Sequence, residues 1–223
     1  MFITGDRLNM LKAIISSKQV KILVILLMLN VDISTTWYII PLNKKTILQA
    51  ICTLHETLGH IDLAIACAGT GEINATLDYA VERPTIDTNV VGWTFVIDML
   101  YHIFERQGCG YLVAITSAGG LRGEPMAPAY SATKAYQINY MEALRKKAFK
   151  NGGHIIVTDI RPGLVDTAMA KGEGLFWVMP VEKVANQIIT AIRKKKSKAY
   201  VTKRWHILAI INKILPYCLY KRM

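Results

Sequence analysis

A tyrosine and a lysine four residues apart are the side chains of this sequence best suited to proton transfer. Tyr130 and Lys134 stand in a segment with helical spacing, so both side chains lie on one helix face, about one turn apart. A free tyrosine has a pKa of about 10, and a neighbouring ammonium group favours the phenolate. The pair therefore has the chemistry of a general acid or base that works near neutral pH.

Spacing alone is weak evidence, because Tyr217 and Lys221 repeat it near the C-terminus. A bare pair of this kind is more commonly two surface residues of a helix. Ser117 distinguishes the first pair, since it precedes Tyr130 by thirteen residues, ends an apolar run and is followed by one alanine and two glycines. Thirteen residues before Tyr217 the sequence has Arg204.

Apolar runs rich in β-forming residues alternate with longer segments of helical spacing, a pattern that predicts βαβ units and a parallel sheet. The expected strands are 21–31, 61–68, 111–117, 154–160 and a short one at 199–202. The expected helices are 43–58, 84–105, 129–150 and 181–195, followed by an apolar helix from about residue 205. With 223 residues and no repeat or linker, the chain is predicted to be an α/β protein with one doubly wound parallel sheet.

Ligands of such a sheet bind outside the carboxyl ends of the strands. The distinctive residues of the sequence follow those ends. They are Asp32 after the first long strand, Ala68 and Gly69 after the second, Ser117 after the third, and Arg161, Pro162 and Gly163 at the fourth. We therefore expect one site that draws residues from four separate strand ends.

Several of these segments resemble the classical short-chain dehydrogenases/reductases. Ile-Thr-Ser-Ala-Gly at 115–119 and Ala-Tyr-Ser-Ala-Thr-Lys-Ala at 129–135 look like the family's catalytic strand and helix. Three further family motifs match Ala-Cys-Ala-Gly at 66–69, Asp-Thr-Asn-Val-Val-Gly at 87–92 and Arg-Pro-Gly-Leu-Val-Asp-Thr at 161–167. The matches occur in the family's order over roughly residues 2–202, and they imply a Rossmann-like fold.

The resemblance implies hydride transfer between NADP or NAD and a carbonyl or secondary alcohol. Tyr130 would exchange the hydroxyl proton, and Ser117 would hydrogen-bond the substrate oxygen. Lys134 would lower the tyrosine pKa and hold the nicotinamide ribose, and Asn89 would anchor a chain of water molecules. The implied cofactor-binding residues are Asp32, Ala68, Gly69, Tyr130, Lys134, Pro162, Gly163, Val165 and Thr167. No metal site is expected.

The sequence departs from the family at its N-terminus. The family begins with a strand, a glycine-rich turn and a helix that binds the pyrophosphate, whereas residues 2–11 resemble the family's second strand. We therefore expect a dehydrogenase-like domain over 1–203 without the first βα unit, in which the sheet leaves a gap or re-pairs. Cofactor binding is expected to be weak, so a non-catalytic remnant or binding module of the same fold is the alternative.

The net charge of +11 is concentrated near the C-terminus. Residues 191–223 contain ten basic and no acidic residues, against 17 basic and 16 acidic in the first 190, which argues against nucleic-acid binding by the domain. Segment 204–223 is predicted to be an apolar helix flanked by basic residues. It either packs on its own domain or on a second subunit of a homo-oligomer, or lies on an anionic membrane surface.

The four cysteines are far apart and have neither metal-binding nor disulfide spacing, which indicates reduced thiols in a cytoplasmic protein. The apolar run at 22–31 is too short to cross a bilayer, and no secretory leader is apparent. Segment 168–180 is rich in large apolar residues. It indicates a hydrophobic small-molecule substrate, or simply packing against the core.

Overall fold

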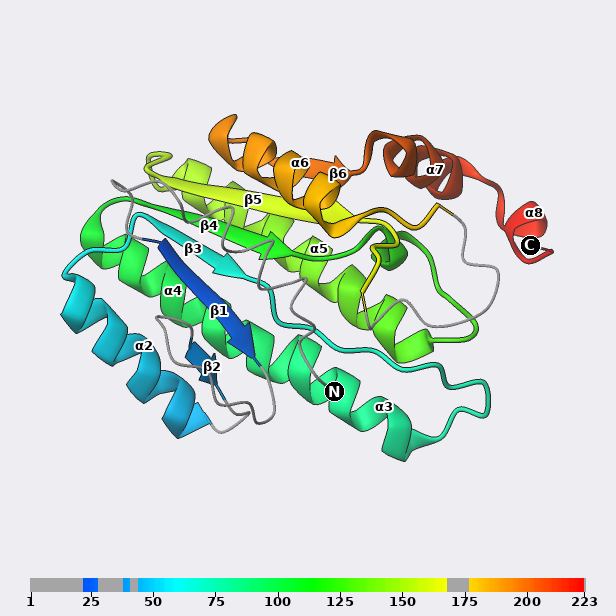
Figure 1. The fold of residues 1–223 in the computed structure, drawn as a ribbon, viewed down its shortest axis with the longest axis horizontal. Coiled ribbons are helices and arrows are strands. Elements are labelled where there is room, and N and C mark those ends of the chain that lie inside the picture. Colours follow the sequence, from blue (N-terminus) through cyan, green and yellow to red (C-terminus); the bar gives the residue numbers. More distant parts are fainter. Residues whose placement is uncertain (1–21, 28–37, 41–43, 168–176, 223) are drawn as a thin grey trace.

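A parallel sheet with helices on both faces forms the centre of the molecule (Figure 1). The computed structural model describes residues 22–27, 38–40, 44–167 and 177–222. Six strands in the described part lie in the order β2-β1-β3-β4-β5-β6, and every neighbouring pair is parallel. The strands are β1 (Ile22–Leu27), β2 (Tyr38–Ile40), β3 (Leu63–Ala66), β4 (Gly110–Ile115), β5 (Ile155–Pro162) and β6 (Lys198–Val201). The predicted Rossmann-like α/β fold is confirmed.

The two faces of the sheet have separate apolar cores. On one face α2 (Lys44–Leu58), α4 (Trp93–Gln107) and α5 (Pro128–Lys150) bury side chains such as Ile51, Leu100 and Met141. On the other face α6 (Val181–Arg193) packs Val184 and Ile188 against the opposite side of the strands. Burial on both faces explains why the central strands read as continuous apolar runs rather than as alternating ones.

At the N-terminal side of the sheet, β1 pairs directly with β3, from Ile22 opposite Leu63 to Ile25 opposite Ala66. The expected absence of the first βα unit, with a gap or a re-paired sheet, stays a prediction. β2 was not expected, because three residues are too few to produce a recognisable alternation. Segment 2–11 and Asp32 lie outside the described residues.

The helix expected at 84–105 begins earlier and is divided. α3 (Tyr79–Ile86) starts after Asp78, whose carboxylate caps the helix by accepting from the Ala80 amide at 2.8 Å. A π-helical turn, η1 (Asp87–Gly92), then leads into α4, and it carries Asn89. The sequence interpretation placed Pro84 at the helix start, but the proline lies inside α3. Such π turns frequently occur at functional sites.

The expected C-terminal helix is two helices, α7 (Lys203–Ile214) and α8 (Tyr217–Tyr220), separated at Pro216. Both are attached to the rest of the chain. The Arg122 guanidinium donates to the Leu215 carbonyl, and the Tyr220 hydroxyl donates to the Gly123 carbonyl. One side of the segment therefore contacts its own chain. No helix in the described ranges is both long and apolar enough to span a membrane.

Candidate active site

Ser117 lies just beyond the carboxyl end of β4, where the chain enters the 3₁₀ turn η2 (Ala118–Leu121). Its Oγ accepts a hydrogen bond from the Gly119 amide at 3.0 Å, so the serine caps this turn. A Cβ atom on Gly120 would lie 2.6–2.8 Å from backbone atoms of Lys134 and Ala135. Glycine at that position therefore allows the turn to approach α5 closely enough to bring Ser117 beside the helix.

Tyr130 and Lys134 extend from the N-terminal part of α5. The helix begins at Pro128, and proline is tolerated in the first turn of a helix. The Lys134 Nζ lies 5.8 Å from the centroid of the Tyr130 ring. A Cβ atom on Gly119 would be 3.3 Å from the Ser117 Oγ and 3.6 Å from the Tyr130 Cε1. The serine and the tyrosine therefore border the same glycine, with the lysine one turn along the helix.

The Lys134 side chain is only 4% exposed, and its ammonium group is held by protein acceptors. Its Nζ donates to the Gln137 Oε1 at 3.0 Å and to the Ile115 carbonyl at 3.5 Å. The Gln137 amide nitrogen in turn donates to the Asn89 carbonyl at 2.9 Å. Gln137, which is fully buried, thus joins the lysine to the π turn. Sequence reasoning missed this residue, although it lies three positions after Lys134 on the same helix.

Asn89 is fully buried and contacts protein rather than the cavity. Its Oδ1 accepts from the Thr70 amide at 2.9 Å, and its Nδ2 donates to the Thr70 carbonyl at 2.7 Å and to the Thr133 Oγ1 at 3.0 Å. These bonds tie the loop after β3 to η1 and α5. Asn89 therefore holds the parts of the site together, and the water chain implied for it remains a prediction.

A cavity of about 460 Å³ lies at the carboxyl ends of the strands, a size typical of small-molecule sites. It is lined by most of the predicted site residues, namely Ser117, Tyr130, Lys134, Gly69, Pro162, Gly163, Val165 and Thr167. Ala68 is buried beside it and is not part of the lining, and Asp32 lies outside the described residues. The structure thus gathers eight of the eleven predicted residues around one space.

Much of the remaining cavity wall is apolar and comes from α6 and α7. Val184 and Ile188 contribute from α6, and Trp205 and Leu208 contribute from α7. Trp205 packs directly on Gly163, where a Cβ atom would lie 2.1 Å from the indole ring. Sequence reasoning assigned the C-terminal helix no part in the site. The C-terminal helix reaches the cavity because β6 pairs with β5, and no local sequence pattern predicts that pairing.

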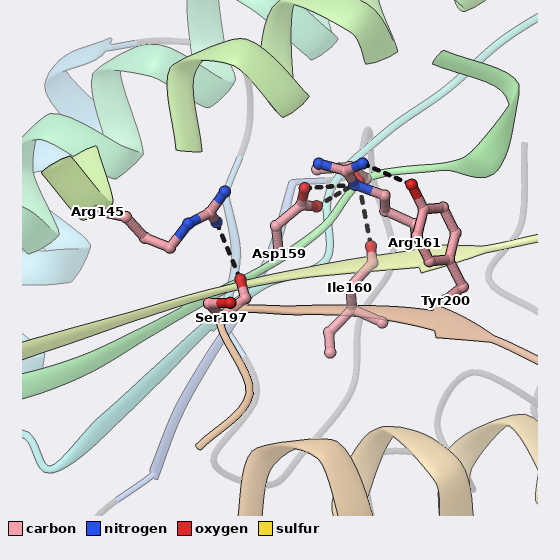
Figure 2. Close-up of polar contacts among 7 residues, drawn as sticks. Arg145, Asp159, Ile160, Arg161, Ser197 and Tyr200 are labelled. Atoms are coloured by element: carbon pink, nitrogen blue, oxygen red, sulfur yellow. Dashed lines mark hydrogen bonds and ion pairs between the residues drawn. The ribbon is translucent and has the colours of Figure 1, made fainter. Parts of the chain in front are cut away.

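A buried ion pair in β5 is at the centre of a hydrogen-bond network between neighbouring strands (Figure 2). The Arg161 Nε donates to the Asp159 Oδ2 at 2.7 Å, and its Nη1 donates to the Tyr200 hydroxyl at 2.9 Å. The Thr116 hydroxyl donates to the other oxygen of Asp159 at 2.6 Å. Burial lowers the pKa of the Arg161 guanidinium, but Asp159 and the Tyr200 hydroxyl together outweigh burial and raise that pKa. The network links β4, β5 and β6 next to the serine and the Pro-Gly turn.

Comparison with known proteins assigns the chain to a family. A family model described as "short chain dehydrogenase" matches residues 40–175, more than half of the chain. The chain belongs to the short-chain dehydrogenase family. The resemblance inferred from its motifs is thereby confirmed.

Curated relatives of this short-chain dehydrogenase include uncharacterised oxidoreductases of staphylococci. One from Staphylococcus haemolyticus is 30% identical over 154 residues, which are 67% of this chain and 66% of the relative. One from Staphylococcus aureus is 32% identical over 129 residues, 57% of this chain and 55% of the relative. The matched part of the chain therefore spans between half and two thirds of these relatives.

Solved structures show the same fold. A short-chain dehydrogenase from Burkholderia cenocepacia in complex with NADP has a TM-score of 0.79 and 16% identity, covering 97% of this chain and 92% of that one. An NADPH-dependent 3-quinuclidinone reductase from Rhodotorula rubra has a TM-score of 0.62 and 21% identity, covering 74% and 69%. At these identities the likeness concerns the fold alone.

Proposed function

We propose that this short-chain dehydrogenase is an NAD(P)-dependent oxidoreductase that interconverts a hydrophobic carbonyl compound and the corresponding alcohol. The observation that carries the proposal is the placement of Ser117, Tyr130 and Lys134 around one cavity beside the Pro-Gly turn after β5. Family membership and the NADP complex of the Burkholderia cenocepacia protein support it.

The residues present fit the nicotinamide and ribose half of a dinucleotide. A buried ammonium, two hydroxyl groups and the turn from Pro162 to Val165 face the same cavity. Lys134 would hold the ribose, and Thr167, whose hydroxyl donates to the Val165 carbonyl at 3.3 Å, would meet the carboxamide. Asp32, one of the implied cofactor-binding residues, lies outside the described residues, and the proposal includes both NADP and NAD.

Each side chain of the set has a distinct task in this proposal. When bound, the dinucleotide supplies or accepts the hydride. The Tyr130 hydroxyl gives a proton to the substrate oxygen in reduction and removes it in oxidation, and the neighbouring Lys134 ammonium stabilises the phenolate that remains. The Ser117 Oγ hydrogen-bonds the same oxygen as negative charge develops on it. Asn89 and Gln137 hold the lysine and its surroundings in position.

The cavity wall indicates the substrate class. Beyond the catalytic set, apolar side chains from α6 and α7 predominate, among them Val184, Ile188, Trp205 and Leu208. Burial of an apolar substrate there would contribute roughly 25 cal/mol per Å² of surface removed from water. We therefore propose a hydrophobic ketone, aldehyde or secondary alcohol. We also propose, from the family resemblance, that the chain forms a homo-oligomer.

The alternative, a non-catalytic remnant of the fold, is not favoured by any feature of the described residues. Three of the four residues proposed for catalysis line a cavity of suitable size. Burial of the Lys134 ammonium is costly even with its hydrogen bond to Gln137, and the proposed catalysis gives that charge a use.

The test is the oxidation of NADPH and NADH by the purified chain with a panel of apolar ketones and aldehydes. Substitution Tyr130→Phe removes the proton donor, and kcat/KM is expected to fall by a factor of about 100 or more. The matched control is Tyr217→Phe, because Tyr217 has the same spacing to a lysine, is 71% exposed and lies outside the cavity. The control should retain the unsubstituted rate.

Equal rates for Tyr130→Phe and the unsubstituted chain would contradict the proposed role of the tyrosine. No turnover of any substrate with either nucleotide, together with no nucleotide binding by fluorescence titration, would favour the non-catalytic alternative.

A further inference from the structure

One face of α7 is a row of exposed isoleucines. Ile207, Ile210, Ile211 and Ile214 are 62%, 48%, 46% and 73% exposed. Their spacing of three and four residues places them on one side of the helix. Leu208 and Ala209, on the opposite side, line the cavity. The two sides of α7 are therefore both apolar, but the described part of the chain covers only one of them.

Two further apolar side chains are exposed in α8, where Tyr217 is 71% and Leu219 is 51% exposed. We call these six residues the isoleucine face. A single exposed isoleucine on a protein surface needs no explanation, whereas several in contiguous positions mark an interaction site. The contacts of Arg122 and Tyr220 hold the two helices to the body, so the isoleucine face remains directed away from it.

The charged side chains of α7 and α8 and of the residues that follow them are all positive. Arg204, Lys213, Lys221 and Arg222 are exposed on α7 and beside α8, and the sequence has no acidic residue from 191 to 223. A second copy of the chain docking through the same face would bring like charges together, which costs free energy. A negatively charged surface would complement them.

We propose that the isoleucine face docks on the surface of an anionic lipid bilayer. α7 has 12 residues and is about 18 Å long, against a hydrocarbon thickness of about 30 Å, so it lies in the plane of the interface. The isoleucines enter the boundary between headgroups and acyl chains, and the basic side chains bind lipid headgroups. This docking does not depend on the proposed catalytic activity.

The experiment is sedimentation of the full chain with vesicles of phosphatidylcholine alone or of equal parts phosphatidylcholine and phosphatidylserine. We expect binding to the anionic vesicles only, decreasing as salt is added. The double substitution Ile210→Ser with Ile211→Ser should lower the partition coefficient by about tenfold or more. Lys221→Glu with Arg222→Glu should lower it as well and weaken its dependence on salt.

The control is Phe149→Ser, because Phe149 is 82% exposed at the end of α5, outside the isoleucine face. It should bind vesicles like the unsubstituted chain, and circular dichroism would show that every variant is folded. Failure of the unsubstituted chain to sediment with anionic vesicles would overturn the proposal, as would equal binding by the serine variant. If the serine substitutions instead convert a dimer to a monomer on sizing without affecting vesicle binding, the occupant is a second copy and the proposal is wrong.

Discussion

At the scale of single residues, the site depends on a lysine whose charge is buried. Lys134 is acceptable in the interior because the Gln137 side chain accepts from its ammonium and donates to the Asn89 carbonyl. The glutamine is fully buried, so water offers no easy replacement for either bond. The precise position of the catalytic ammonium therefore rests on a residue that does not line the cavity.

Substitution Gln137→Leu is expected to lower the free energy of unfolding by about 2–4 kcal/mol, because it leaves two buried polar groups without one of their partners. Denaturant unfolding followed by circular dichroism would measure this. Asn139→Leu, at an exposed position of the same helix, serves as the control and should change stability by less than about 0.5 kcal/mol. A leucine variant as stable as the unsubstituted chain would refute the structural part of the argument.

At the scale of elements, the approach of turn η2 to helix α5 determines where Ser117 lies. The contact involves the backbone of α5, since a Cβ atom on Gly120 would meet the carbonyl carbon and oxygen of Lys134 and the amide nitrogen of Ala135. Backbone cannot adopt another rotamer to make room, so the turn itself would have to move away from the helix.

We therefore expect Gly120→Ala to destabilise the protein by about 1–3 kcal/mol and to reduce kcat more than it raises KM, because the serine is displaced from the tyrosine. Gly123→Ala is the matched control, three residues further along, where a Cβ atom would meet nothing within 4 Å. Thermal unfolding and steady-state kinetics of both variants would test this. Similar stability and kinetics of the two alanine variants would show that activity does not require the close approach of η2 to α5.

At the scale of the whole molecule, the first 190 residues have a net charge close to zero, whereas residues 191–223 are strongly basic. The cavity is lined by residues from both parts of the chain. The neutral part contains tyrosines whose protonation is coupled to folding. Burial, aided by a hydrogen bond to Asp98, raises the pKa of Tyr140 far above its ordinary value. Burial also raises the pKa of Tyr101 and of Tyr111.

A raised pKa in the folded state means that the fold binds the phenolic proton more tightly than the unfolded chain does. Its contribution to stability is complete below the unfolded pKa of about 10 and is lost as the pH rises above it. We expect the free energy of unfolding to fall steeply above about pH 10, and less steeply in Tyr140→Phe. Urea unfolding from pH 8 to pH 11 would measure both slopes, and equal slopes would show that Tyr140 does not contribute.

Much of the fold could be predicted from sequence because its signals are local. The strands that are buried on both faces appear as apolar runs, and the helices between them keep a helical period. The grouping of Ser117 with Tyr130 and Lys134 was also predictable, since a strand end and the following helix of one βα unit are neighbours in any parallel sheet. By itself, the sequence thus determined the class of the fold and the residues expected at its strand ends.

Other features were decided by contacts between residues far apart in the chain. Trp205 reaches Gly163 only because β6 pairs beside β5, and the exposure of Ile210 depends on which side of α7 faces the cavity. The link from Lys134 through Gln137 to the Asn89 carbonyl likewise requires α5 to pack against the π turn. Local propensity does not encode strand order or the burial of one helix side, so the tertiary structure alone determined which apolar residues line the cavity and which remain exposed.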